Sequence, residues 1–428
     1  IDDPTDRYLF PAALYAVNLD TGERRKLTDG DAAQPHWSPS GARIAFWSMD
    51  KAGIRDIKTI SRAGGEAVSV TNDVAVDWNP VWSPDGKYLY FASNRGGSMN
   101  FWRVAVDEKT GKTLGNPVPF TTPSMFSQNL TVAADGKTLA YVQIAFTTNI
   151  FRAEFDARAE TLSQKPIPVA PGARIDRNPA ISPDGEWLAF DAIKDKQEDL
   201  FIMRRDGSNL LQLTNDVYKD RAPRWSHDGE KIIFYSDRAG KNESWTINPN
   251  GSGLQQISFD TEPFALLAFW SPDGKKMIQN VTQNYPKIFE AEKPLNAQTP
   301  FEIPDEKNPD VWAMAFSWSP DGEKIASIRM NKKADDDMGV VVYSFASNKH
   351  EELSDFGDCP VWLNDSRRLI FFDKNKIFLL DTLTKKTKEL ASLASSETLQ
   401  NITISPDNRF VYYSLQKKES NLWMATAE

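Results

Sequence analysis

The sequence predicts an all-β chain, folded as a single β-propeller of four-stranded antiparallel blades. One phrase recurs nine times in 428 residues: an aromatic or aliphatic residue, then Ser-Pro-Asp-Gly or a close variant, then a strand. Successive copies begin 42–50 residues apart, which is the period expected of propeller blades. A ring of such repeats grows without needing new cores, so the repetition outweighs chain length in deciding the architecture.

The chemistry of the phrase indicates a tight turn between two strands. Pro presets φ, Asp caps the turn and Gly takes a positive φ, while the leading residue ends the innermost strand of its blade. The nine copies begin at Trp37, Trp82, Val132, Ile181, Trp225, Trp270, Trp318, Trp362 and Ile404. We therefore expect structural roles for the recurrent aspartates Asp85, Asp184, Asp228, Asp273 and Asp321.

Each hairpin is followed by a third strand, such as NFWRV or DLFIM, and commonly by a fourth that ends in Leu-Thr or a relative of it. The endings are Leu27-Thr28, Val70-Thr71, Phe120-Thr121, Leu213-Thr214, Ile257-Ser258 and Leu353-Ser354. A lone four-stranded sheet cannot bury both faces. Blades must therefore stack around an axis.

The repeats predict one domain over residues 1–428, with nine blades preferred and eight as the alternative. The approximate repeats are 29–71, 72–121, 122–170, 171–214, 215–258, 259–304, 305–354, 355–391 and 392–428. Residues 1–28 contain a third strand, Ala13–Val17, and a fourth, Glu23–Thr28, whereas the last repeat ends after a third strand. We therefore expect strands from both termini to close the ring, which removes exposed sheet edges.

Composition narrows the classes of partner. The net charge of -9 and the pI of about 5.2 argue against nucleic acid, which needs clustered Lys and Arg. The single cysteine, Cys359, excludes an intrachain disulfide. No stretch approaches the roughly 18 apolar residues needed to span a membrane, so membrane insertion by this chain itself is not expected. Because residue 1 is Ile, the chain reads as processed or truncated, and the parent protein can carry an anchor.

The repeat resembles that of TolB-type propellers, on the strength of PVWSPDGKYLYFASNRGG (80–97) and PRWSHDGEKIIFYSDRAG (223–240). It is similar in particular to the sensor propellers of bacterial receptor-like Ser/Thr kinases and winged-helix regulators. The segments that carry this second likeness are 77–111, 354–372 and 420–428. The resemblance implies a periplasmic or extracellular sensor or scaffold, without the kinase or DNA-binding activities.

No catalytic constellation emerges from the sequence. The G-x-S-x-G elbow of propeller-bearing serine peptidases is missing, and its nearest approach is GGSMN (96–100). The three histidines, His36, His227 and His350, fall in different repeats and at different structural positions. We therefore expect no metal, no cofactor and no Ser-His-Asp triad. The acidic run at 335–337 is expected to be a solvated turn rather than a Ca²⁺ site.

A ligand site is expected at one mouth of the central channel, where the chain enters each innermost strand. Aligning the repeats there gives a charged group and a mainly apolar group. The candidate residues are Asp77, Trp78, Gln128, Asp176, Arg177, Asp220, Arg221, Phe264, Leu266, Trp312, Met314, Asp358 and Gln400. Such a mouth suits a protein or peptide segment with an anchoring side chain. Alternatively, the Asp and Arg residues pair between blades and the apolar set is core.

Three functions remain open from the sequence. The favoured one is a non-catalytic binding, sensor or scaffold propeller that engages a protein, peptide or small ligand. The second is the propeller portion of a hydrolase or other enzyme whose catalytic part lies outside this chain. The third is a structural component of a larger assembly.

Overall fold

The computed structural model confirms the all-β class. It describes residues 12–49, 54–96, 99–120, 127–169, 174–194, 197–259, 265–281, 286–293, 295–303, 310–331 and 337–426. Within these ranges the single helical element is one 3-10 turn, η1 (Leu295–Ala297), and the other named elements are strands. No helix in the described ranges is both long and apolar enough to cross a membrane.

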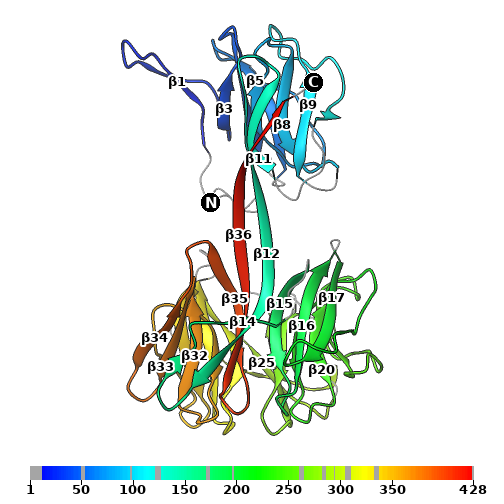
Figure 1. Cartoon of the computed structure of the whole chain (residues 1–428), viewed down its shortest axis with the longest axis vertical. Coiled ribbons are helices and arrows are strands. Elements are labelled where there is room, and N and C mark those ends of the chain that lie inside the picture. Colours follow the sequence, from blue (N-terminus) through cyan, green and yellow to red (C-terminus); the bar gives the residue numbers. More distant parts are fainter. Residues whose placement is uncertain are drawn as a thin grey trace. The chain divides into compact units, whose positions relative to one another are not determined.

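The chain divides into two compact units, whereas the sequence predicts one domain (Figure 1). Unit 1 comprises Ile1–Ala145 and Lys418–Glu428, and unit 2 comprises Phe146–Lys417. Two long strands, β12 (Thr138–Asp156) and β36 (Phe410–Thr426), contain residues of both units.

Unit 2 contains five four-stranded antiparallel sheets, each formed by four consecutive strands. The first two sheets are β15 (Ile175–Ile181), β16 (Trp187–Lys194), β17 (Gln197–Arg204), β18 (Leu211–Gln212), and β19 (Asp220–Trp225), β20 (Ile232–Ser236), β21 (Glu243–Ile247), β22 (Gln255–Gln256). The third and fourth are β23 (Ala265–Trp270), β24 (Lys276–Val281), β25 (Lys287–Glu290), β26 (Phe301–Glu302), and β27 (Val311–Trp318), β28 (Lys324–Asn331), β29 (Asp337–Ser344), β30 (Lys349–Glu352). The fifth is β31 (Asp358–Trp362), β32 (Arg368–Asp373), β33 (Lys376–Asp381), β34 (Lys386–Ser392).

A sixth sheet closes unit 2 into a ring. It contains β35 (Glu397–Ile404), the part of β36 up to Lys417, the part of β12 from Phe146, and β14 (Ile167–Pro168), with β13 (Thr161–Leu162) also pairing with β12. Its innermost strand, β35, contacts β15 on one side and β31 on the other. The intervening sheets contact one another in chain order, so the six sheets form a closed circle.

Unit 1 contains the other three copies of the repeat. The strands are β3 (Ala33–Trp37), β4 (Arg43–Met49), β5 (Arg55–Ser61), β6 (Val68–Ser69), then β7 (Asp77–Trp82), β8 (Tyr88–Ser93), β9 (Asn100–Ala105), β10 (Val118–Pro119), and finally β11 (Ser127–Val132) paired with β12. The predicted N-terminal strands form a separate two-stranded sheet, β1 (Tyr15–Val17) with β2 (Arg24–Lys26). They do not complete the last repeat.

The blade count therefore differs from the nine, or alternatively eight, that the sequence predicts. The physical reason lies between the second and third strands of two repeats. The other repeats have Gly, Pro, Asp or Asn at this point, but residues 143–148 (QIAFTT) and 414–420 (SLQKKES) have none of these. Without a turn the chain continues straight, which produces the long strands β12 and β36. Each of these two hairpins then receives its third strand from the other repeat.

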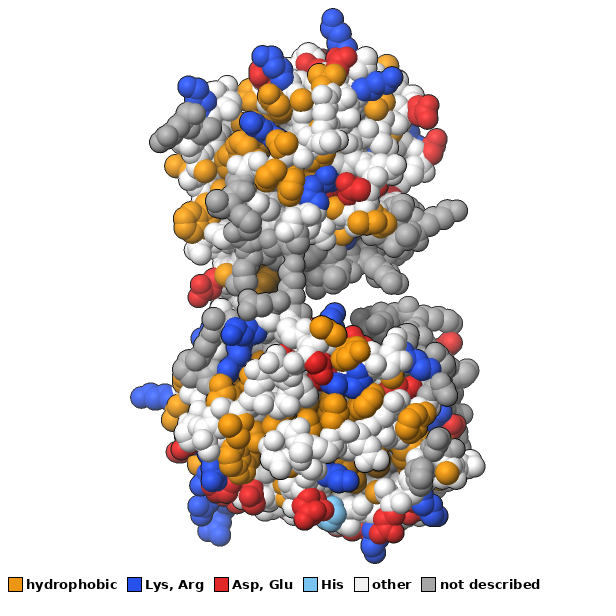
Figure 2. Space-filling view, turned by 90° about the vertical axis from the view of Figure 1, so that its right-hand side faces the viewer, with side chains coloured by type: hydrophobic (Ala, Val, Ile, Leu, Met, Phe, Trp, Pro, Cys, Tyr) orange, Lys and Arg blue, Asp and Glu red, His pale blue; other side chains and the backbone are white. Residues whose placement is uncertain are grey.

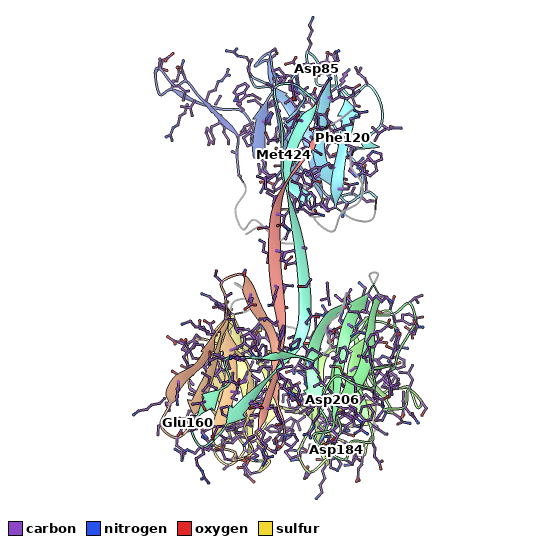
Figure 3. The ribbon with its side chains drawn as sticks, viewed as in Figure 1. Asp85, Phe120, Glu160, Asp184, Asp206 and Met424 are labelled. Carbon is purple, nitrogen blue, oxygen red and sulfur yellow. The ribbon has the colours of Figure 1, made fainter. Side chains whose placement is uncertain are left out.

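The expected role of the turn aspartates is confirmed. In each Ser-x-Asp-Gly turn the serine hydroxyl donates to the aspartate, at 2.6 Å from Ser83 to Asp85, and the amide two residues further on donates to the same carboxylate. These hydrogen bonds lower the pKa of Asp85. Asp85 and Asp184 mark such turns in units 1 and 2 (Figure 3). These carboxylates therefore have a structural role in their turns.

The Leu-Thr endings have a role that the sequence did not predict. The hydroxyl of Thr71 accepts the amide N–H of Ile57 at 2.9 Å, and that of Thr214 accepts the amide of Leu200 at the same distance. Ser258 bonds Ser244 in the same way at 2.7 Å. The fourth strand thus caps a backbone donor of the third strand that would otherwise be buried without a partner.

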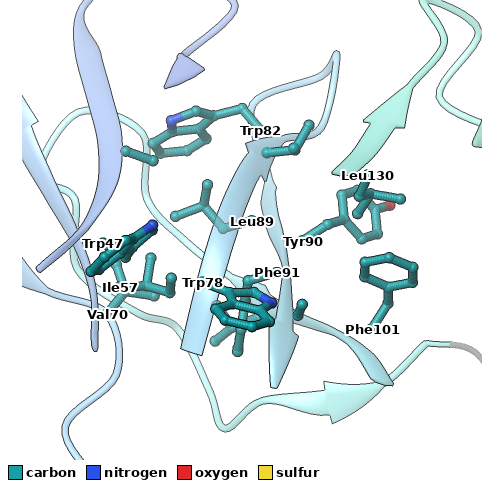
Figure 4. Close-up of a cluster of buried hydrophobic side chains, with 14 of the residues drawn as sticks. Trp47, Ile57, Val70, Trp78, Trp82, Leu89, Tyr90, Phe91, Phe101 and Leu130 are labelled. Atoms are coloured by element: carbon teal, nitrogen blue, oxygen red, sulfur yellow. The ribbon is translucent and has the colours of Figure 1, made fainter. Parts of the chain in front are cut away.

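The cores lie between neighbouring sheets and are rich in aromatic residues. In unit 1, Trp47, Trp78, Trp82 and Phe91 pack together with side chains of the β11–β12 hairpin (Figure 4). Large rings recurring at one place per repeat fill the widening space between twisted sheets. On the face of each unit that Figure 2 shows, acidic and basic side chains are interspersed.

Candidate functional site

A cavity of about 430 Å³ lies at the hub of unit 2, and all six innermost strands line it. Its walls are mainly aromatic, aliphatic and hydroxyl-bearing. The lining residues are Ala180, Ile181, Ser182, Pro183, Arg224, Trp225, Ser226, His227, Phe269, Trp270, Ser271, Pro272, Phe316, Ser317, Trp318, Val361, Asn401, Ile402, Thr403, Ile404 and Pro406. A concave, largely apolar site with a few polar groups is typical of ligand-binding pockets.

A network of four charged side chains stands nearby, on β15, β16, β17 and β19. Arg177 donates to Asp191 through Nε at 3.0 Å and Nη2 at 2.8 Å, and its Nη2 also lies 2.8 Å from Glu198. Arg221 donates to Glu198 through Nη2 at 2.7 Å and through Nε. Because Arg221 belongs to the next sheet, this pairing joins two blades.

The network favours the charged forms of Glu198, Arg177 and Arg221. Burial opposes ionisation of Glu198, but hydrogen bonds from Arg221 and Arg177 prevail and lower its pKa to about 2. The carboxylate of Glu198 raises the pKa of Arg221, and Asp191 and Glu198 together raise that of Arg177 despite its burial. The Glu198 carboxylate is therefore ionised at neutral pH.

Asp191 also holds the backbone of the hub. Its Oδ1 accepts Nδ2 of Asn178 at 2.7 Å and the amide of Ala222 at 3.1 Å. Asn178 and Ala222 sit in β-bulges of β15 and β19 and have φ of 52°. A bulge leaves one residue of the strand unpaired, so a neighbouring side chain must satisfy its amide. Asn280 does the same for Ala315, at 2.8 Å.

The pairing register of the innermost strand shifts in every repeat, and the shift includes or adjoins the residue three positions before the phrase. The residues at this position are Gln34, Asn79, Asn129, Asn178, Ala222, Leu267, Ala315, Cys359 and Asn401. Asn tolerates a positive φ better than most residues, which accounts for its frequency here.

Three of the predicted mouth residues are instead buried structural groups. Asp77, Asp176 and Asp220 are fully buried, and each pairs with an arginine. In unit 1 Arg95 donates to Asp77 at 2.7 Å, and in unit 2 Arg238 donates to Asp220 at 2.7 and 2.6 Å. For Asp77 and Asp220 the arginine comes from the S-x-R-x-G segment 18 residues downstream, whereas Asp176 pairs with Arg174, two residues upstream. An uncompensated carboxylate would be costly there, so burial requires the pair.

The other predicted residues are not brought together into one mouth. Trp78 and Trp312 are buried, so they contribute to core. Leu266, Met314 and Asp358 are half-buried on β23, β27 and β31, and burial raises the pKa of Asp358. Gln400 is exposed, Gln128 lies in strand β11, and Phe264 lies outside the described residues. The predicted residues also divide between the two units, with Asp77, Trp78 and Gln128 in unit 1.

The histidines remain separate in the structure. Nδ1 of His36 accepts the amide of Trp82 at 3.3 Å, and burial lowers the pKa of His36. His227 is exposed at a turn, and His350 packs beside the ring of Tyr343. The described ranges contain no group of three or more His, Cys, Asp or Glu side chains arranged for a metal ion. Of the acidic run at 335–337, Asp335 and Asp336 lie outside those ranges.

Sequence reasoning missed Asp191, Glu198 and Arg224. The sequence does contain a signal for Asp191, which interrupts the apolar run LAFDAI of repeat 4. A charged side chain in a buried strand needs a partner. Arg224 comes directly before Trp225 in PRW, a position where other repeats of unit 2 have Ala, Phe, Ser, Val or Thr.

A ring of radially packed four-stranded sheets around a lined hub defines unit 2 as a β-propeller. The chain belongs to the TolB beta propeller domain family, whose sequence pattern matches residues 11–166 and 131–299. The expected TolB-type resemblance is thereby confirmed.

Relatives match only over part of the chain. An uncharacterized peptidase, YuxL, of Bacillus subtilis is 27% identical over 205 residues, which cover 45% of this chain and 28% of YuxL. Dipeptidyl-peptidase 5 of Porphyromonas gingivalis is 32% identical over 108 residues, which cover 23% of this chain and 15% of that protein. The chain thus spans less than a third of either relative. The solved structure of a putative TolB from Agrobacterium tumefaciens is 16% identical, with a TM-score of 0.24 over 94% of this chain and 96% of that one.

Proposed function

We propose that this chain is a non-catalytic binding propeller that takes up a protein or peptide segment in the hub cavity of unit 2. The observation that carries the proposal is the cavity itself, which all six innermost strands line and whose walls are mainly apolar and aromatic. Three tryptophans line it, Trp225, Trp270 and Trp318, and Trp is a frequent energetic anchor of protein recognition. Membership of the TolB propeller family supports a sensor or scaffold role in the periplasm or outside the cell.

The charged network supports binding over catalysis. Arg177 and Arg221 are tied to Asp191 and Glu198 by short hydrogen bonds, and the pKa of Glu198 is far below neutral. Such a network gives the hub a rigid, polarised rim. It supplies no general base near neutral pH and no activated nucleophile.

Panning a phage-displayed dodecapeptide library on the immobilised chain tests this function. We expect a related set of peptides to be enriched, and Thr403→Trp, which fills the cavity from β35, to abolish their binding at unchanged thermal stability. Thr384→Trp on an exposed turn is the matched control and should leave binding intact. Enriched peptides that bind Thr403→Trp as tightly as the unsubstituted chain would place binding elsewhere and overturn the proposal.

A second function is favoured by one observation, the peptidase names of two partial relatives. Under it, the chain is the propeller portion of a peptidase whose catalytic part lies beyond these residues. The parent reading frame decides the matter, since an α/β-hydrolase domain with a G-x-S-x-G elbow would establish it.

A further inference from the structure

Among the described residues that line the hub cavity, Arg224 is the one charged side chain. At the equivalent position, one residue before the phrase, the other five sheets of unit 2 have uncharged side chains that also line the cavity. These are Ala180, Phe269, Ser317, Val361 and Thr403. The guanidinium therefore sets the electrostatic character of the cavity interior.

Arg224 has no carboxylate partner within the described part of the chain. Its Nη1 donates to the backbone carbonyl of Pro223 at 2.8 Å, but no Asp or Glu oxygen of that part lies within 4.0 Å of its nitrogens. This contrasts with Arg177 and Arg221, which are both fully paired.

The surroundings of Arg224 make an unpaired charge unfavourable. Arg224 is half-buried in the cavity wall, and desolvation lowers its pKa, although an arginine remains charged in such an environment. The Cys359 thiol and then Asp191 act on it in the opposite direction without forming an ion pair, and Asp191 is already bonded to Arg177 and Asn178. Asp358 lies on another strand and does not pair with it. A half-buried guanidinium without an ion-pair partner favours an anionic ligand.

A second polar group in the cavity wall is unsatisfied. Oδ1 of Asn401 is buried and has no hydrogen-bond partner. Its orientation follows from its neighbours. The carboxylate of Asp191 accepts Nδ2 of Asn178, so Oδ1 of Asn178 faces Asn401 and accepts its Nδ2 at 3.2 Å. The carbonyl oxygen of Asn401 is therefore the atom left without a donor.

The apolar walls restrict the ligand further. Nε1 of Trp225 donates to the carbonyl of Ala180 at 2.9 Å, and Nε1 of Trp318 to that of Gly322 at 2.8 Å. With their polar atoms already bonded, these rings offer hydrocarbon surface to a ligand. The cavity thus combines a cationic donor that has no carboxylate partner in the described part of the chain with apolar walls.

We infer that Arg224 binds a carboxylate of the peptide ligand. The inference rests on the proposed function and names the chemistry of its ligand. A peptide supplies a carboxylate either at its C-terminus or on an Asp or Glu side chain.

Three tripeptide probes distinguish these sources by calorimetry on the whole chain at low ionic strength. They are N-acetyl-Ala-Ala-Ala with a free carboxylate, its C-terminal amide, and N-acetyl-Ala-Glu-Ala amide. We expect at least one carboxylate-bearing probe to bind tenfold or more tightly than the uncharged amide. Tight binding of the first probe indicates a chain end, and of the third an acidic side chain. Equal affinity for all three, or no binding of any at 10 mM, overturns the inference.

Arg224→Met should abolish the preference for a carboxylate, whereas Arg409→Met, at a side chain that is 78% exposed, should retain it. Without ligand, Arg224→Met should raise the midpoint of thermal unfolding, because a half-buried charge without an ion-pair partner gives way to an apolar chain of similar length. A lowered midpoint with the preference retained shows a structural arginine and refutes the inference. Dodecapeptides blocked by Thr403→Trp but indifferent to Arg224→Met would refute it while leaving the proposed function standing.

Discussion

Arg238 places one guanidinium nitrogen, Nη2, at 2.7 and 2.6 Å from the two carboxylate oxygens of Asp220, which is fully buried. The same guanidinium lies 5.3 Å from the ring centre of Trp245 and 5.9 Å from that of Phe234, so the pair is enclosed by aromatic rings. Arg95 and Asp77 repeat the arrangement in unit 1. The pair anchors the start of an innermost strand to the loop between strands two and three.

We expect Asp220→Asn to destabilise the protein by about 3 kcal/mol, because it removes the buried one of the two carboxylates, Asp220 and Asp216, that pair with Arg238. Urea unfolding followed by tryptophan fluorescence measures the change. Glu186→Gln is the matched control. Its contacts with Arg204 and Arg205 are longer, at 3.7 and 3.5 Å, and exposed, so a loss of about 0–1 kcal/mol is expected. Equal effects of the two substitutions would contradict a structural role for the buried pair.

The interaction of Glu198 with Arg177 and Arg221 should appear in acid unfolding. Its folded-state pKa of about 2 lies below the ordinary value of 4.5, so the unfolded chain binds more protons between these values. This contribution to stability is complete above about pH 5 and is lost as the pH falls towards 2. Glu198→Gln should cost about 2–3 kcal/mol at pH 7 and flatten the stability profile between pH 2 and 4.5. An unchanged slope in the variant would show that Glu198 is not the titrating group.

Much of the local structure could be predicted from the sequence, because each turn carries its own chemistry. Asp85 and the other turn aspartates needed no tertiary information. The division into two units follows from the missing turn residues at 143–148 and 414–420, which lie outside the repeated phrase. The residues of a repeat predict the strands of that repeat. They do not predict which repeat supplies the third strand of a given sheet, because the open edge of any hairpin can pair with such a strand.

The candidate site shows the same limit. Arg177 and Arg221 were identified because they lie on the innermost strands, where the repeats were aligned. Their partners Asp191 and Glu198 lie on β16 and β17, and pairing across strands follows from register, which the phrase does not encode. Arg224 could not be identified from its own repeat for another reason. It stands out only by comparison, because its five counterparts around the ring carry no charge.

Asp199 should affect stability in the opposite direction to Glu198. Burial, together with the carboxylates of Asp220 and Asp216, raises its pKa to about 6. The folded protein therefore binds more protons than the unfolded chain between about pH 4 and 6, and stability falls as the pH rises through this window. Asp199→Asn should gain about 1–2 kcal/mol at pH 7 and remove this slope.

Thermal unfolding measured from pH 4 to 8 tests that expectation. Asp206→Asn is the control, since Asp206 is exposed on a turn and the hydroxyl and amide of Ser208 lower its pKa. It should not stabilise the protein at pH 7. If Asp199→Asn is also neutral or destabilising there, the hydrogen bonds from Gln212 and Thr214 outweigh the charge repulsion.

Residues 146–417 should fold on their own, because their six sheets close into a ring within one continuous stretch of chain. The closing strands are the second part of β12, which pairs with β36 of the C-terminal β35–β36 hairpin, and β14, which pairs with β12. We expect a purified 146–417 fragment to show the circular dichroism of β-sheet and a cooperative thermal transition. Burial of every sheet face between two neighbours supplies the stability.

A fragment of residues 174–417 is the matched control, since it lacks those closing strands and leaves β36 as an open edge. It should aggregate or unfold at a markedly lower temperature, because an unpaired edge beside an apolar sheet face invites association. A nine-blade ring makes a different prediction. Both fragments would then be incomplete arcs, each with two open ends, and neither would unfold cooperatively. Only a large difference between the two fragments supports closure by β12 and β14.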